Sequence, residues 1–375
     1  MQLRLWPIIV IGLLLMATPA DAYPQFQLAL GTDRCSACHW SPAGGGVLGD
    51  LGRDEASSLA LLGGDGRFLH GVATPPDWLS VGGDFRFASG VKQLHDQDRE
   101  VLAFPMQADL YGRATVGPIS VNLTVGLNGS ARGRTAGIGL LSYVVSRQHY
   151  LEYRSEEQTL NVRAGRFFPV FGSRTQDHTA YSRRYLDQGV LQEPYAVEVG
   201  LSRGAWDVFA AGFIGNPVAF TGTGPFASGA TAYVERVFDV SSLAINARYA
   251  QTTEDYRVIA GAVGKHWLAT PGIMLIGELA VGRQSFAGPG DARVQLLAYA
   301  QATKLVLPGF MFGATIQRWS PDLFLSAASR NAFQLDVQTF PYAHVELHLL
   351  LRAEATGGDT TTPNLVGLFQ LHYFL

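Results

Sequence analysis

The chain has 375 residues and a formal net charge of −3, and only 16% of its residues are charged, against roughly 25% in a typical soluble domain. A hydrophobic content of 47% with so little charge excludes a disordered chain, and the charge balance gives no reason to expect a nucleic-acid partner. The 43 glycines argue against a mainly helical protein, because glycine weakens helices. Beyond the N-terminus no apolar run reaches the ~18 residues that a transmembrane helix needs.

Residues 1–22 have the pattern of a secretory signal peptide. Arg4 gives a positive start, Trp6 to Met16 form the apolar stretch, and Ala20-Asp21-Ala22 is a small-residue cleavage site. An uncleaved membrane anchor is the alternative, but the apolar stretch is short for a span. We therefore expect the mature chain to start near Tyr23, outside the cytoplasm.

The only two cysteines stand in the run Cys35-Ser36-Ala37-Cys38-His39. This C-x-x-C-H spacing is the signature of c-type haem attachment, in which each thiol adds to a haem vinyl group and the adjacent histidine binds the iron. A local disulfide and a thioredoxin-like pair are the alternatives, and a zinc site would want further ligands nearby. The sequence predicts one covalent haem c, held by a short segment over 23–77 with a helix near Asp54 to Leu62.

The sixth ligand of that iron is open at this stage. Between Tyr23 and Trp78 there is no methionine, and His70 is the only other histidine. Either His70 completes a bis-histidine site, or the position is vacant or filled from elsewhere. A polar linker residue without a ligand role is the alternative interpretation of His70.

From residue 78 onward the dominant pattern has a period of two. Leu243, Ile245 and Tyr249, for example, alternate with polar residues such as Asn246 and Arg248, which is typical of a strand with one apolar face. We expect sixteen such strands, many about ten residues long, the length that crosses a bilayer when tilted. Their expected starts lie near residues 79, 101, 118, 143, 159, 195, 205, 229, 241, 255, 272, 292, 309, 331, 342 and 365.

The connections between these segments alternate in length. Seven are short, for example Gly204 alone or Pro341, and they interleave with longer polar loops such as 129–142, 168–194 and 215–228. Short turns at one rim and long loops at the other are typical of an outer-membrane barrel. Aromatic residues near segment ends would suit the two interfacial girdles: Trp78, Phe104, Tyr143, Tyr150, Tyr153, Trp206, Phe213, Trp267, Trp319, Phe340, Tyr342 and Tyr373. The predicted fold over 78–375 is all-β, a transmembrane antiparallel β-barrel of about sixteen strands.

This pattern resembles bacterial outer-membrane porin-like barrels of the sixteen-strand class. The last strand, with Phe369, Leu371 and Tyr373 on one face, resembles the C-terminal sequence of such proteins, although Leu375 stands where Phe is usual. The stretch Cys35 to Gly46 looks like that of predicted haem-bearing outer-membrane proteins, and less like the barrels that sheath separate multihaem proteins. The resemblance implies a barrel in outer-membrane lipid with the haem segment in the periplasm, passage of small solutes and a possible homotrimer.

In porins the third long loop folds into the lumen and narrows the pore, and here that loop is 168–194. Mixed charges across a lumen set ion selectivity, whereas a solvated extracellular loop is the plainer interpretation. The candidate constriction residues in this loop are Arg174, Asp177, His178, Arg183, Arg184 and Asp187, and Arg163 and Arg166, just before it, would add to a basic wall.

Three functions fit these patterns. The leading hypothesis is an outer-membrane porin-like protein with one c-type haem, acting in electron transfer with periplasmic or extracellular redox proteins, in solute passage, or in both. The second is a passive porin whose haem is structural or sensory, and the third is a soluble periplasmic β-rich haem enzyme. We do not expect a substrate-converting enzyme, because the common hydrolase, metalloprotease and phosphate-binding motifs do not occur.

Overall fold

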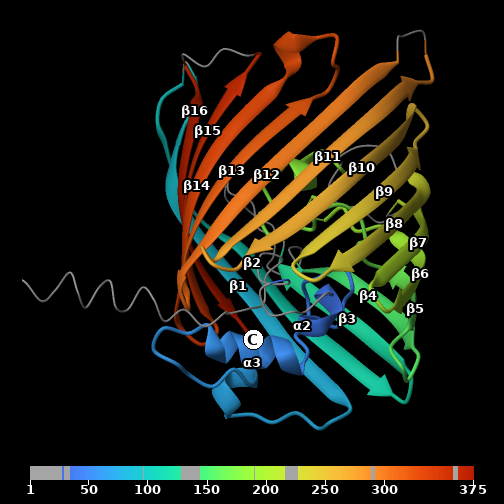
Figure 1. The fold of residues 1–375 in the computed structure, drawn as a ribbon, viewed down its shortest axis with the longest axis vertical. Helices are drawn as coiled ribbons and strands as arrows, with labels where there is room; N and C mark the ends of the chain where they lie inside the picture. Colours follow the sequence, from blue (N-terminus) through green and yellow to red (C-terminus); the bar gives the residue numbers. More distant parts are fainter. Residues whose placement is uncertain are drawn as a thin grey trace, which may run out of the picture.

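The computed structural model describes residue 28 and residues 34–95, 97–127, 144–189, 191–215, 227–288, 292–357 and 362–375. The predicted signal peptide, 1–22, lies outside the described residues. Sixteen antiparallel strands form one closed barrel, which confirms the predicted fold class (Figure 1). The strands are β1 (Leu79–Gln93), β2 (Glu100–Val116), β3 (Ile119–Leu127), β4 (Val144–Arg154), β5 (Leu160–Arg166), β6 (Tyr195–Arg203), β7 (Trp206–Ile214), β8 (Ser228–Phe238), β9 (Ser241–Gln251), β10 (Asp255–Leu268), β11 (Ile273–Phe286), β12 (Arg293–Leu307), β13 (Phe310–Ser320), β14 (Arg330–Tyr342), β15 (Val345–Thr356) and β16 (Asn364–Phe374).

Each strand pairs with the next in sequence, and β1 pairs with β16 through partners such as Asp84 and Phe374. The expected strand starts agree closely with those observed. The largest shift is at β15, expected near 342 and beginning at Val345. Pro341 and Tyr342 extend β14, and the turn lies at Ala343-His344, where His344 has a φ of 68°.

Along the strands the apolar side chains point out of the barrel and the polar ones point in, the reverse of the arrangement in a water-soluble protein. In β9 the apolar side chains of Leu243 and Ile245 are exposed, at 51% and 65%, while Ser242 and Asn246 are buried. The same inversion runs round the barrel, with Leu201 of β6 also exposed. Such an apolar band is unfavourable in water and is stable against lipid.

Part of the aromatic girdle prediction is wrong. Trp78, Trp206 and Tyr342 are exposed as expected. Four other members of the predicted set are buried inside instead, because their strand positions place them on the inward face: Tyr150, Phe213, Trp319 and Phe340. Tyr143 lies outside the described residues.

The N-terminal segment lies against the rim that carries the short turns. It contains α2 (Cys35–Cys38), α3 (Asp50–Ser58) and the 3-10 helix η1 (Phe68–Gly71), and Figure 1 shows α2 and α3 beside the C-terminal end of the chain. The expected helix over 54–62 begins earlier, because Gly49 caps it and Asp50 lies in its first turn. Leu61 N donates to Phe340 O at 2.8 Å. The described helices include none long and apolar enough to cross a membrane.

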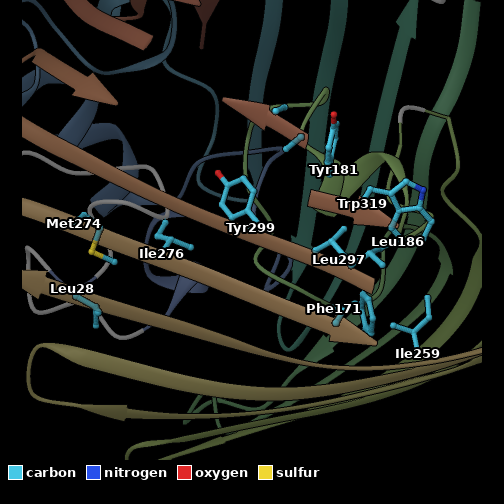
Figure 2. Close-up of a cluster of buried hydrophobic side chains, with 13 residues drawn as sticks. Leu28, Phe171, Tyr181, Leu186, Ile259, Met274, Ile276, Leu297, Tyr299 and Trp319 are labelled. Atoms are coloured by element: carbon cyan, nitrogen blue, oxygen red, sulfur yellow. The ribbon is translucent and has the colours of Figure 1, made fainter. Parts of the chain in front are cut away.

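The loop between β5 and β6, residues 167–194, folds into the barrel, and we call it the lumen loop. Its side chains Phe171, Tyr181 and Leu186 pack on inward residues of the wall (Figure 2). The ring of Tyr185 stacks on Trp319 with centroids 4.8 Å apart. The loop contains one short helix, α4 (Tyr181–Arg184). The loop therefore lies inside the barrel, and its role as a pore constriction stays a prediction.

Candidate functional site

The cysteine motif forms a single helical turn. Residues three apart on a helix share a face, so α2 brings Cys35 and Cys38 together, and His39 N donates to Cys35 O at 3.0 Å. Neither cysteine forms a disulfide, and Cys38 is buried while Cys35 is half-buried. The motif therefore places two thiols and an imidazole within five consecutive residues.

The helix α3 supports this turn at close range. Gly49 N donates to Cys38 O at 2.9 Å. A Cβ at Gly52 would clash with the same carbonyl oxygen, whereas a Cβ at Gly49 would meet it at an ordinary 3.7 Å. Glycine at position 52 thus allows α3 to lie directly against the motif.

Arginines of the barrel wall hold the residues that follow the motif. Arg154 Nη2 donates to Trp40 O at 2.6 Å, and the Arg113 guanidinium lies 4.3 Å from the centroid of the Trp40 ring, a cation–π distance. Arg163 Nη1 donates to Ser41 Oγ at 3.2 Å. The segment is therefore docked inside the mouth of the barrel.

Two more arginines complete this docking. Arg34, just before the motif, bonds Asp207 Oδ1 at 2.8 Å and Gly204 O at 2.6 Å. Arg174 of the lumen loop donates to Pro42 O at 2.6 Å. The motif is thus held on one side by a short turn of the barrel and on the other by the lumen loop.

Cys35, Cys38 and His39 line a single cavity inside the barrel. The opposite walls carry Asp84 and Arg86 from β1, His372 from β16, and a row of lumen-loop residues that includes His178 and Arg183. The cavity has a volume of about 250 Å³, close to the lower end of the roughly 300–1,000 Å³ usual for small-molecule and cofactor pockets.

The cavity wall is rich in arginine. Most of these side chains face carboxylates: Arg147 bonds Asp109 at 2.5 Å, and Arg86 bonds Asp84 at 3.1 Å. Arg183 differs, because it donates to the carbonyl oxygens of Gln188 and Thr175 at 3.2 and 3.1 Å. It is a cation of this wall with no carboxylate at ion-pair distance among the described residues.

The other predicted constriction residues are tied into the wall. Arg163, fully buried, pairs with Glu198, and Arg166 pairs with Glu193 at 3.4 Å. Arg174 Nη2 lies 3.5 Å from Glu235. The remaining contacts are Asp177 with Arg352, Asp187 with Arg257 and Arg248, and the exposed Arg184 over the ring of Tyr185.

His70 does not line the cavity of the motif. It lies on η1, where its ring meets His344 edge-on with centroids 4.8 Å apart, and its Nε2 is 3.2 Å from the hydroxyl of Tyr373. Sequence reasoning placed His70 near the motif because both are in the short N-terminal segment. The chain instead carries His70 to the rim at the turn between β14 and β15.

The donor set and its surroundings fit a c-type haem. The two cysteines form no disulfide, and the motif histidine lines the same hollow as both of them. The backbone of Gly44 to Gly46 lines that hollow with open space where side chains would be. Over the described part of the chain, no group of three or more His, Cys, Asp or Glu residues is placed to hold a bare metal ion, so the motif has no partners for a zinc site there.

Sequence reasoning missed the wall residues Asp84, Arg86 and His372. Asp84 and Arg86 alternate with apolar residues of β1, which predicts that both side chains point into the barrel. The pattern does not show which part of the N-terminal segment lies opposite these two residues. That depends on the docking of residues 34–59, which has no local sequence signal.

No protein-family model matches the sequence, and no curated protein matches it. Solved structures do match the fold. OmpF of Salmonella typhi, in complex with daunomycin, gives a TM-score of 0.61 at 10% identity, over 79% of this chain and 97% of that one. The trimer form of in-vitro folded OmpT from Vibrio cholerae gives 0.57 at 11%, over 79% and 99%. An anion-selective porin from Comamonas acidovorans gives 0.56 at 10%, over 79% and 99%. At these identities the likeness shows the fold alone, that of a porin-like outer-membrane barrel.

Proposed function

We propose that this chain is an outer-membrane porin-like protein that carries one covalently attached c-type haem in the mouth of its barrel and acts in electron transfer. The observation that carries the proposal is that Cys35, Cys38 and His39 line one cavity inside the barrel. A motif outside the barrel could attach a haem equally well. Because the motif of this chain is docked in the lumen, residues of the barrel wall also line the proposed haem site.

The residues have separate roles in this proposal. Cys35 and Cys38 would supply the two thiols that attach the haem, and His39 would supply an imidazole to hold its iron. Arg183 offers its guanidinium to the charge of a propionate, since it has no carboxylate partner among the described residues. A haem held this way supplies one-electron Fe(III)/Fe(II) chemistry. The chain's own contribution is to bind it, orient it and keep bulk water from one face.

The apolar band supports a location in the outer membrane, and the rim with the short turns indicates which end of the barrel faces the periplasm. Exposed leucine, isoleucine and valine side chains round the barrel support a place in outer-membrane lipid. Short turns face the periplasm in such barrels, so the docked segment would meet a periplasmic redox protein. Since one similar barrel is described as a trimer, a homotrimer is part of the proposal, and the size of the detergent-extracted protein tests it.

Electron transfer is favoured over solute passage by the filling of the lumen. The lumen loop packs against the inward faces of β10 to β14, and Leu59 of the N-terminal segment is buried with Phe340 at the mouth. A general diffusion pore needs a continuous aqueous path. The lumen loop and the N-terminal segment occupy part of the lumen beside the cavity of the motif.

The proposal is tested by haem staining after denaturing electrophoresis, with the protein produced in cells that attach c-type haem. The wild type should stain, and the double variant Cys35→Ser, Cys38→Ser should not. The double variant should still show heat-modifiable migration, which reports a folded barrel. An unstained wild-type band would overturn the proposal.

A further inference from the structure

The cavity of the motif has a second face that the lumen loop builds. Pro169, Arg174, His178 and Arg183 belong to it. In a haem site the sixth ligand lies across the porphyrin plane from the proximal histidine. With His39 on the motif side, that ligand has to come from another wall of the same cavity.

Two of the described residues on those other walls carry an imidazole, His178 and His372. His372 is engaged on both sides. Its Nδ1 lies 2.6 Å from Glu346 Oε2 and its Nε2 lies 3.1 Å from Asp84 Oδ1. Within the described part of the chain only Nδ1 makes a hydrogen bond, to Glu346, but two carboxylates at this distance favour the doubly protonated ring, which has no electron pair to give to iron.

His178 has the opposite environment. Its Nε2 lies 3.4 Å from Arg86 Nη1. A guanidinium only donates, so this nitrogen presents its lone pair, and at 3.4 Å the bond is long and weak. Arg86 also bonds Asp84 through two other nitrogens, at 3.1 and 3.2 Å. Arg86 therefore stays paired if His178 Nε2 gives its electron pair to iron instead.

The position of His178 is fixed by its neighbours in sequence. The carboxylate of Asp177 accepts from Arg352 Nη2 of β15 at 2.8 Å. It also accepts from the backbone N and the hydroxyl of Thr179, at 2.8 and 2.6 Å. Asp177 and Arg352 are therefore positioning residues that clamp this part of the lumen loop to the wall.

From this geometry we propose that His178 is the sixth ligand of the haem iron, so that the lumen loop and the N-terminal segment close on the haem from opposite sides. The assignment rests on the proposed function. It replaces His70 as the candidate sixth ligand with His178, more than a hundred residues later in the chain. The haem would then join the lumen loop to the N-terminal segment. The assignment also places the iron inside the barrel.

The test uses the full-length protein in detergent, with its covalent haem and with heat-modifiable migration as proof of folding. The wild-type ferric haem should be six-coordinate and low-spin by absorption and electron paramagnetic resonance. His178→Ala should turn it high-spin, and added imidazole should restore the low-spin spectrum. His178→Met should stay six-coordinate and raise the reduction potential, as methionine ligation does. His70→Ala and His372→Gln are the matched controls and should leave the low-spin spectrum unchanged.

Each other outcome has one meaning. A low-spin spectrum in His178→Ala without added imidazole, or loss of it in either control, overturns the assignment and leaves the proposed function standing. A high-spin wild type does the same. A wild type with no covalent haem overturns the proposed function and this assignment with it.

Discussion

Arg174 of the lumen loop donates a 2.6 Å hydrogen bond to the backbone carbonyl of Pro42, four residues past Cys38 in the haem motif. Its other terminal nitrogen lies 3.2 Å from the hydroxyl of Tyr233 and 3.5 Å from Glu235. One side chain therefore joins the barrel wall, the lumen loop and the motif segment. Contacts of this kind decide whether the segment stays docked in the mouth.

Replacing Arg174 by alanine should loosen the motif segment. Hydrogen bonds that involve a charged group contribute about 1.5–3 kcal/mol, so Arg174→Ala should weaken docking by about 2 kcal/mol. Hydrogen–deuterium exchange over residues 34–59 measures this directly. Arg184→Ala, at an exposed arginine of the same loop, is the control and should change exchange little. Equal exchange in Arg174→Ala and wild type would contradict the docking role.

Gly52→Ala should displace α3 from the motif turn, since the added Cβ would clash with Cys38 O. Overpacking of this kind costs about 1–3 kcal/mol. We expect lower thermal stability of the segment and a smaller fraction of chains carrying haem. Gly49→Ala is a matched control, because its Cβ would lie at an ordinary 3.7 Å from the same oxygen. Equal haem content in the two variants would show that the close approach does not matter.

Docking of residues 61–72 at the rim should depend on pH through His344. Burial lowers the pKa of His344, and the nearby His70 acts in the same direction. Its Nε2 lies 3.1 Å from Arg67 O, and Tyr373 and the Asp65–Arg67 pair also face this cluster. Because the docked state prefers the neutral ring, its contribution is complete above the free pKa of about 6.5.

That contribution is lost as the pH falls from about 6.5 through the lowered pKa of the docked ring, by at most about tenfold in the docking equilibrium per pH unit. Exchange over residues 61–72, corrected for the intrinsic effect of pH, should therefore rise between pH 7.5 and 5.5. In His344→Gln, which keeps a donor for Arg67 O but does not titrate, the rise should disappear. A rise of the same size in this variant would assign the pH dependence to another group.

The lumen loop and the docked segment obstruct part of the lumen, which predicts an ionic current in planar bilayers below that of a general diffusion porin in the same set-up. The double variant Tyr181→Ala, Tyr185→Ala should raise the current several-fold. It removes the hydrogen bond from Tyr181 to Glu354 and the stack of Tyr185 on Trp319, which hold the loop against the wall. Tyr249→Ala, on the outward face of β9, is the control. A wild-type current as large as that of a general porin would favour a passive channel.

Much of the barrel was predictable from sequence, because inward and outward residues differ in polarity along each strand. The run at Leu243 to Tyr249 gives both the strand and its lipid-facing side. The single residue Gly204 marks a turn, and its φ of 56° is one that glycine tolerates best. These features are local, so alternation and turn chemistry suffice.

What the sequence did not predict depends on contacts between distant segments. The run Ile273-Met274-Leu275-Ile276 is apolar on both faces, which signals that this inner wall packs against something apolar, here a cluster that contains Leu28 and side chains of the lumen loop. The sequence does not say what that partner is. The same limit explains His178 and His70. Proximity in sequence favoured His70, but folding of the loop brings His178 to the cavity of the motif.

The most direct test of the central claim is peptide mapping by mass spectrometry of the protein from cells that attach c-type haem. The account predicts one haem per chain, bonded through Cys35 and Cys38 on the peptide that also contains His39. Two free thiols, or a disulfide between Cys35 and Cys38, in protein that shows heat-modifiable migration would contradict it.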